Sequence, residues 1–82
     1  MIKVKIFSSN NAKLEEFACN EVKLEDIHQG VLVVLSDYQN SIFALKPHSF
    51  IALKTEEGEV KELEIKNASV AKFAQNTMTV FI

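Results

Sequence analysis

Two short apolar segments in the middle of the chain constrain its fold most strongly. They are residues 31–35 and 41–45, and the five polar residues 36–40 separate them. The second segment stops at Lys46-Pro47, because proline cannot donate a ladder hydrogen bond and restricts the residue before it. Residues 31–35 contain no polar residue, which is typical of a strand with both faces covered. The pattern predicts a strand–loop–strand unit at the centre of a small all-β chain.

Further strands are predicted on both sides of this unit. Residues 2–6 alternate between apolar and lysine side chains, as a half-buried strand does. In residues 18–25 the inward positions would be Ala18, Val22 and Leu24, whereas residues 14–17 could form a strand or one helical turn. The other strands are expected at 49–54, 60–65, 70–73 and 78–82, with turns at 8–11, 26–30, 55–59, 66–68 and 76–77. We therefore expect a small antiparallel β-sandwich of about eight to ten short strands.

Length and charge narrow the classes of function. The 82 residues fit one domain spanning residues 1–82, with a net charge of -2. All nine basic residues are lysines, so the chain lacks both the basic patch of nucleic-acid-binding proteins and the arginine preferred for phosphates. It has no apolar run of about 18 residues, and its alternating N-terminus does not resemble a signal peptide. We expect no nucleic-acid partner and no membrane-spanning segment.

The residue pattern gives little support to metal or thiol chemistry. The possible metal ligands Cys19, His28 and His48 are scattered, and no pair has the spacing of a metal motif. A lone cysteine cannot form an internal disulfide, so we interpret Cys19 as a small packing residue. We expect no bound metal and no cofactor.

Hydrolytic chemistry has equally weak support. Ser36, Asp37 and His48 could be combined into a triad, but no Gly-x-Ser-x-Gly turn surrounds Ser36 or Ser41. Two glycines are too few for a phosphate-binding loop. The adjacent glutamates at 15–16 and at 56–57 would point to opposite faces of a strand and so could not share one substrate. We expect no catalytic residues.

The polar loop 36–40 is a candidate for a binding surface. It contains the only tyrosine, Tyr38, among small polar residues. Aromatic residues in loops often anchor protein interfaces, but an ordinary connection between two strands explains the same residues. The pattern leaves both interpretations open.

Several segments also match a known family in order and spacing. Residues 34–35 read V-L, residues 44–47 read A-L-K-P, and residues 76–81 read N-T-M-T-V-F. They resemble the epsilon subunit of F-type ATP synthases, whose N-terminal domain typically reads G-E-F-G-I-L-P-G-H-A-P-L-L-T-A-L-K-P-G from the position of Gly30, and ends N-N-V-T-V-L. The turn at 57–59 and the opening residues 2–7 are similar to that family's T-x-D-G-E and V-x-I-V-T-P. The resemblance covers nearly the whole chain, with few strict identities.

The chain departs from the family at several positions. Residues 36–40 replace P-G-H-A-P, so that Tyr38 takes the place of the family's histidine. Val31 stands where the family has a glutamate associated with the rotor ring, and His48 stands where it has the glycine after Lys-Pro. The family's C-terminal helical hairpin has no counterpart in these residues, which implies coupling without hairpin-based inhibition.

The resemblance implies a non-catalytic central-stalk subunit that docks on the gamma subunit and the c-ring, and so couples proton or sodium flow to ATP synthesis. It would lie on the cytoplasmic side of the bacterial inner membrane, held there by the complex. The gamma-facing residues would be Phe43 and Ser49. The c-ring-facing residues would be Gln29, Val31, Leu32, Asp37, Tyr38, Gln39 and Asn40. The alternative is a free-standing β-sandwich module that binds a protein or peptide through the Tyr38 loop and shares only its topology with the family.

Overall fold

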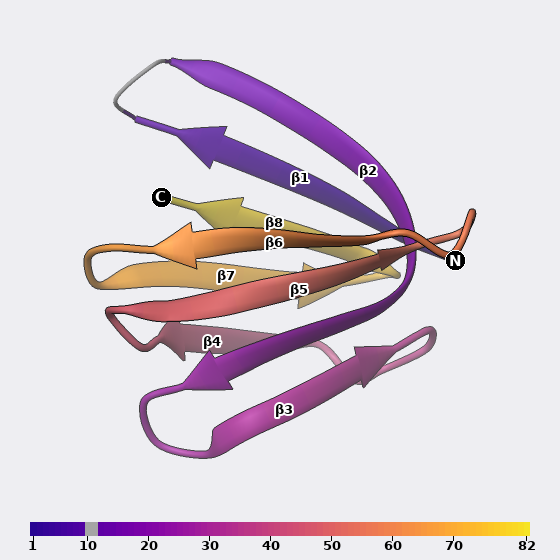
Figure 1. Ribbon diagram of the computed structural model, residues 1–82. Helices are drawn as coiled ribbons and strands as arrows, with labels where there is room; N and C mark the ends of the chain where they lie inside the picture. Colours follow the sequence, from indigo (N-terminus) through magenta and orange to yellow (C-terminus); the bar gives the residue numbers. More distant parts are fainter. Residues whose placement is uncertain (10–11) are drawn as a thin grey trace.

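A computed structural model describes residues 1–9 and 12–82 of the chain, and within them it contains eight strands and no helix (Figure 1). The strands are β1 (Ile2–Ser8), β2 (Lys13–Asp26), β3 (Gly30–Leu35), β4 (Ser41–Leu45), β5 (Ser49–Thr55), β6 (Val60–Ile65), β7 (Ser69–Ala74) and β8 (Thr77–Phe81). The predicted all-β class is confirmed. One pairing differs from the expectation, because β1 and β8 run parallel and the sheet is therefore mixed.

The strands form one sheet that folds into two layers. The pairings β1–β8, β8–β7 and β7–β4 build one layer, while β3, the second half of β2, β5 and β6 build the other. Figure 1 shows β3, β5 and β6 in front of β4, β7 and β8. The apolar side chains between the layers form one core, whose largest fully buried members include Phe43, Phe73, Leu45 and Ile51. This arrangement agrees with the expected β-sandwich.

Strand β2 is longer than predicted and belongs to both layers. Its first half pairs with β1, and its second half pairs with β3 and β5. The pairing with β5 shifts its register between Cys19 and Glu21. Because such a bulge inserts an extra residue, it changes which side chains face inward. Cys19 is therefore buried and Ala18 is exposed, so the predicted inward position of Ala18 is wrong, whereas Val22 and Leu24 are buried as expected.

Strand β3 is covered on one face only. Val34 is buried and Leu32 packs against the core, but Val31, Val33 and Leu35 on the opposite face are 58%, 45% and 52% exposed. The prediction that both faces are covered is therefore wrong. A continuous apolar run is typical of a central strand in a sheet that is covered on both faces. Strand β3 instead pairs with β2 alone, and no second layer covers its outer face.

The turns depend on residues in the left-handed backbone region. Gly58 has a φ of 91° in the predicted connection between β5 and β6. Gln75 and Asn76, with φ of 50° and 56°, form the two-residue turn between β7 and β8, one residue before the predicted position. His48 has a φ of 65° at the start of β5. Of the predicted turn at 8–11, Ser8 belongs to β1, while Asn10 and Asn11 lie outside the described residues.

A buried carboxylate joins the two layers at the end of β2. Asp26 is 3% exposed. Its Oδ1 accepts hydrogen bonds from the backbone N–H groups of His28 (2.8 Å) and Gln29 (3.0 Å), and its Oδ2 accepts one from the N–H of Ala44 on β4 (2.9 Å). Burial alone would raise the pKa of Asp26, but these three N–H groups, with the nearby His28, outweigh it and lower the pKa below its ordinary value. Asp26 therefore shapes the β2–β3 turn and holds it against β4.

Replacing Asp26 should weaken the fold in a pH-dependent way. Asp26→Asn should lower the free energy of unfolding at neutral pH by about 2 kcal/mol, because an amide cannot replace both oxygens as acceptors. Since the folded-state pKa is depressed, the contribution of Asp26 is present above the unfolded-state pKa and is lost as the pH falls through the folded-state pKa. Urea unfolding at a series of pH values should therefore show the two proteins converging in acid. Asp37→Asn, at the other and exposed aspartate, is the control, and an equal effect there would contradict the assignment.

The strain at His48 gives a second prediction. A non-glycine residue in the left-handed region costs about 1 kcal/mol, so His48→Gly should raise the urea midpoint of unfolding, with a gain of that order. Gly58→Ala should have the opposite sign, because it places a side chain at a φ of 91°. A destabilised His48→Gly protein would show that the imidazole makes a stabilising contact that exceeds the backbone strain.

Candidate functional site

An apolar row crosses the outer face of the layer formed by β1, β8, β7 and β4. The strand registers place Leu14 opposite Phe7, Phe7 beside Phe81, Phe81 opposite Val70, and Val70 opposite Ala44. Directly paired residues lie on the same face of a sheet, so these five side chains are neighbours. We call Leu14, Phe7, Phe81, Val70 and Ala44 the apolar row. It is the longest set of adjacent outward-facing apolar residues that the pairings of the described strands produce.

The apolar row is exposed and held in shape by its own contacts. Phe7, Leu14, Val70 and Phe81 are between 40% and 49% exposed. The rings of Phe7 and Phe81 stack with their centroids 5.6 Å apart and an angle of 13° between their planes. Such a pair contributes about 1 kcal/mol beyond the area it buries, which favours a preformed surface.

The neighbouring row on the same strands shows the usual character of a solvent-facing sheet. One step along the strands, the registers align Glu16, Lys5, Thr79 and Lys72, with Ile42 at the far end. Four of these five side chains are polar or charged. The contrast within one face indicates that the apolar row is a local feature, and contiguous exposed apolar patches mark interaction sites.

A second apolar surface lies on the other layer. The outward side chains of β3, namely Val31, Val33 and Leu35, form a stripe along the margin of the sheet. Their paired neighbours on β2 are Glu25, Lys23 and Glu21, so the stripe is one strand wide. We call these three residues the β3 stripe.

The structure places the predicted c-ring-facing residues along β3 and beyond both of its ends. Gln29 precedes β3 in the β2–β3 turn, Val31 and Leu32 belong to the strand, and residues 37–40 follow it. Six residues of strand span about 20 Å, so the two ends are not neighbours. These residues therefore follow the length of β3 and do not form one compact patch, and Leu32 among them packs against the core.

Tyr38 folds back onto the core. It is partly buried, with its ring 6.3 Å from that of Phe43 and 6.1 Å, edge-on, from that of Phe73. In the same loop, the N–H of Asp37 donates to Asn76 Oδ1 (2.6 Å), and Asn76 Nδ2 donates to Asp37 Oδ1 (3.0 Å). The loop does not close a β3–β4 hairpin, because β3 pairs with β2 and β4 pairs with β7. Residues 36–40 therefore carry the chain from one layer to the other, with Tyr38 as a lid on that end of the core.

Both predicted gamma-facing residues lie inside the fold. Phe43 is 1% exposed in the core. Ser49 is 7% exposed, and its hydroxyl donates to the carbonyl oxygen of Lys46 at 2.6 Å. Neither side chain offers a surface to a partner in this structure. A contact at this position would be made by a neighbouring outward residue such as Ile42, which is 71% exposed.

The residues considered for catalysis are not assembled into a site. Ser36 and Asp37 precede β4 and His48 follows it, so the length of that strand separates them. Ser36 Oγ accepts a hydrogen bond from the N-terminal amine at 2.9 Å. Cys19 is buried, and burial, followed by the nearby charge of Glu56, raises the pKa of its thiol, which keeps it protonated. Within residues 1–9 and 12–82 no three His, Cys, Asp or Glu residues are close enough to hold a metal ion.

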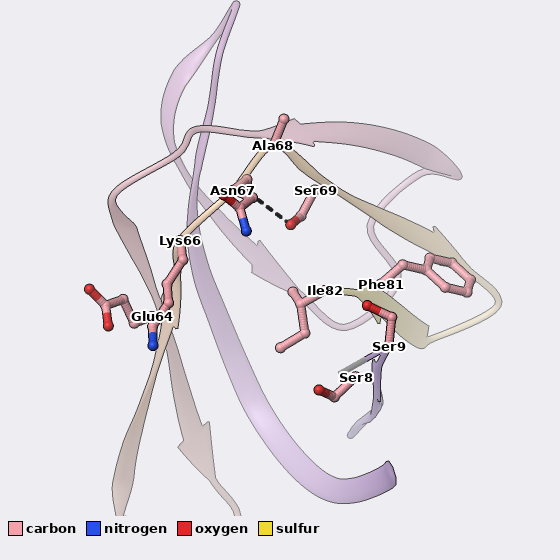
Figure 2. A pocket seen from close by; sticks show the side chains of 9 residues that line it. All are labelled: Ser8, Ser9, Glu64, Lys66, Asn67, Ala68, Ser69, Phe81 and Ile82. Carbon is pink, nitrogen blue, oxygen red and sulfur yellow. Dashed lines mark hydrogen bonds between the residues drawn. The ribbon is translucent and has the colours of Figure 1, made fainter. Parts of the chain in front are cut away.

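A pocket of about 610 Å³ lies where the ends of β1 and β8 approach the β6–β7 turn (Figure 2). Ser8, Ser9 and Ile82 line it on one side and residues 66–69 on the other. Of its nine lining residues only Glu64 and Lys66 carry charge, and Ser69 Oγ donates to the carbonyl oxygen of Asn67. Among the described residues, no salt bridge joins Glu64 and Lys66. Phe81 contributes to its wall as well as to the apolar row, so the pocket borders that surface.

Sequence reasoning missed the apolar row, although part of its signal is visible in the sequence. In β1, β7 and β8 the inward positions alternate regularly, and Phe7, Val70 and Phe81 occupy outward positions where a polar residue is usual. The signal that they are neighbours is the pairing of β1 with β8, which joins the two ends of the chain.

In comparisons with known proteins, no protein-family model and no curated protein matches the chain. Within its described part, the chain has no helix that is long and apolar enough to span a bilayer.

The position of Tyr38 leads to a stability prediction. Tyr38→Ala should lower the free energy of unfolding by about 1–2 kcal/mol, because it removes a partly buried ring that contacts Phe43 and Phe73. Tyr38→Phe should be close to wild type, since the tyrosine hydroxyl is not needed for the ring contacts. Urea unfolding measures both variants, and an unchanged stability of Tyr38→Ala would indicate a ring that is free to anchor a partner.

Proposed function

We propose that this chain is a non-catalytic central-stalk subunit of an F-type ATP synthase. In this proposal it docks on the gamma subunit and sits on the c-ring, and it helps to couple proton or sodium flow to ATP synthesis on other subunits. It is peripheral to the cytoplasmic face of a bacterial inner membrane through the complex. It carries out no chemistry of its own.

The observation that carries the proposal is the apolar row. A subunit that transmits torque needs to be rigid, and it needs a surface that a partner protein covers permanently. Such obligate interfaces are rich in apolar and aromatic residues. The row supplies five adjacent side chains on four paired strands and the first half of β2, with two stacked phenylalanines at its centre. We assign the row to the gamma subunit, in place of the buried Phe43 and Ser49.

Two further features support the proposal. The resemblance to the epsilon subunit runs through the chain in order, and the all-β sandwich is the fold that it implies. His48 adopts a φ of 65° at the position where that family has a glycine, so the backbone keeps a glycine-like conformation there despite the substitution.

The c-ring side of the proposal is assigned to the margin of β3. Gln29, Val31 and residues 37–40 lie along it or at its ends, and most of them are exposed. Asp37 is the only charged side chain among them. Tyr38 would act there by holding the loop on the core rather than by inserting into the ring.

The second candidate is a β-sandwich module that uses the apolar row to bind another protein. It is favoured by the replacement of the whole P-G-H-A-P segment by residues 36–40. Both candidates use the same surface, so the identity of the partner separates them.

Binding to gamma tests the proposal directly. The chain and the gamma subunit from the same source should form a stable complex with one copy of each in a pull-down followed by light scattering. Phe81→Glu should weaken that complex about thirtyfold or more, because it places a charge at the centre of an apolar interface. The matched control is Val60→Glu, which alters a 63% exposed apolar residue on β6, outside the row.

Circular dichroism should confirm that both variants are folded. Absence of a gamma complex with a well-folded wild-type chain would refute the rotor assignment and favour the second candidate. Equal binding by the two variants would place the gamma contact elsewhere.

A further inference from the structure

Strands β3 and β6 each have one unpaired margin, and the two strands differ in their charged side chains. Among the described strands, β3 pairs only with β2, and β6 pairs only with β5. Proteins protect such margins with charged side chains, because unpaired backbone N–H and C=O groups attract other strands. Strand β6 contains Lys61, Glu62 and Glu64, whereas β3 contains no charged residue at all. The open strand β3 is therefore unprotected.

The composition of β3 adds to this difference. Three of its five residues after Gly30 are valines, a residue type enriched in strands, and its outward side chains form the exposed β3 stripe. An uncharged margin with an apolar face is the arrangement that pairs readily with another strand. Figure 1 shows β3 at the edge of its layer, with no strand outside it.

We propose that two copies of the free chain associate by antiparallel pairing of their β3 strands. With Val33 on the two-fold axis, Val31 of each copy would lie opposite Leu35 of the other, and Leu32 opposite Val34. This register keeps outward residues opposite outward ones and inward residues opposite inward ones, as a sheet requires. The two β3 stripes would then form one apolar patch, and no like charges would meet across the junction.

A second copy suits this margin because one uncharged strand is complementary to itself. Every paired position would bring valine or leucine against valine or leucine. In a two-fold dimer each copy uses the same surface, and each β3 has only one free side. This pairing therefore stops at two copies. The pairing would join the two β3-containing layers into one continuous sheet. The inference does not depend on the proposed function, because it concerns the free chain. In the complex of that proposal the c-ring, and not a second copy, would lie along the margin of β3.

The test is the mass of the purified chain at rising concentration, by sedimentation equilibrium. The wild type should change from monomer to dimer between micromolar and near-millimolar concentration. Val33→Lys should raise the dissociation constant about tenfold or more, because it places two lysines against each other at the axis. Val60→Lys, at a valine on β6 that is 63% exposed against 45% for Val33, should leave the dissociation constant unchanged.

Amide hydrogen exchange checks the location independently. Alternate amides of β3 should exchange more slowly at high concentration than at low concentration in the wild type, but not in Val33→Lys. A chain that stays monomeric throughout would overturn the inference. So would a dimer that tolerates Val33→Lys but is broken by Phe81→Lys, because that result would place the contact at the apolar row.

Discussion

The fold depends on β2, which takes part in both layers. Its fourteen residues pair with β1 at one end, with β3 and β5 further on, and with β4 at Asp26. The bulge between Cys19 and Glu21 allows one strand to belong to both layers. It shifts the alternation by one residue, so that Cys19 before it and Val22 after it both point into the core. The carboxylate of Asp26 then fixes the far end through the N–H of Ala44.

This architecture gives the outer faces of the two layers different properties. Parallel pairing of β1 with β8 places Phe7 beside Phe81, although 74 positions separate them in the sequence (81 minus 7). The apolar row thus depends on contacts between the two ends of the chain. On the other layer, β3 is left with a free margin because β4 crosses to β7 instead of pairing with it. One surface suits a permanent partner on a sheet face, and the other suits pairing along a strand.

Much of the fold could be predicted from the sequence, because alternation and turn residues are local signals. Pro47 correctly marked the end of β4, and Gly58 correctly marked the turn after β5. The alternation places Ala18 on the wrong face, because a bulge leaves no clear trace in the sequence. The apolar run of β3 wrongly predicts a covered strand, because composition does not reveal whether a strand lies at the margin of a sheet.

The candidate site was harder to predict, because it depends on which strands are neighbours. Phe7 and Phe81 look like isolated outward residues until the register joins them. Phe43, chosen from a resemblance, is a core residue in this structure. The polar loop leaves open whether Tyr38 is an exposed anchor or part of an ordinary connection, and the contact that decides comes from Phe73 on a distant strand. In each case the deciding contact is far away in the sequence.

The central claim is that the apolar row is the surface that meets the gamma subunit. The most direct measurement is nuclear magnetic resonance of the labelled chain during addition of gamma, observing the methyl groups of Leu14 and Val70 and the rings of Phe7 and Phe81. The account predicts that these signals shift or broaden first, while the methyl groups of Val60 on β6 stay unchanged. Signals of the row that remain in place while other surfaces respond would contradict it.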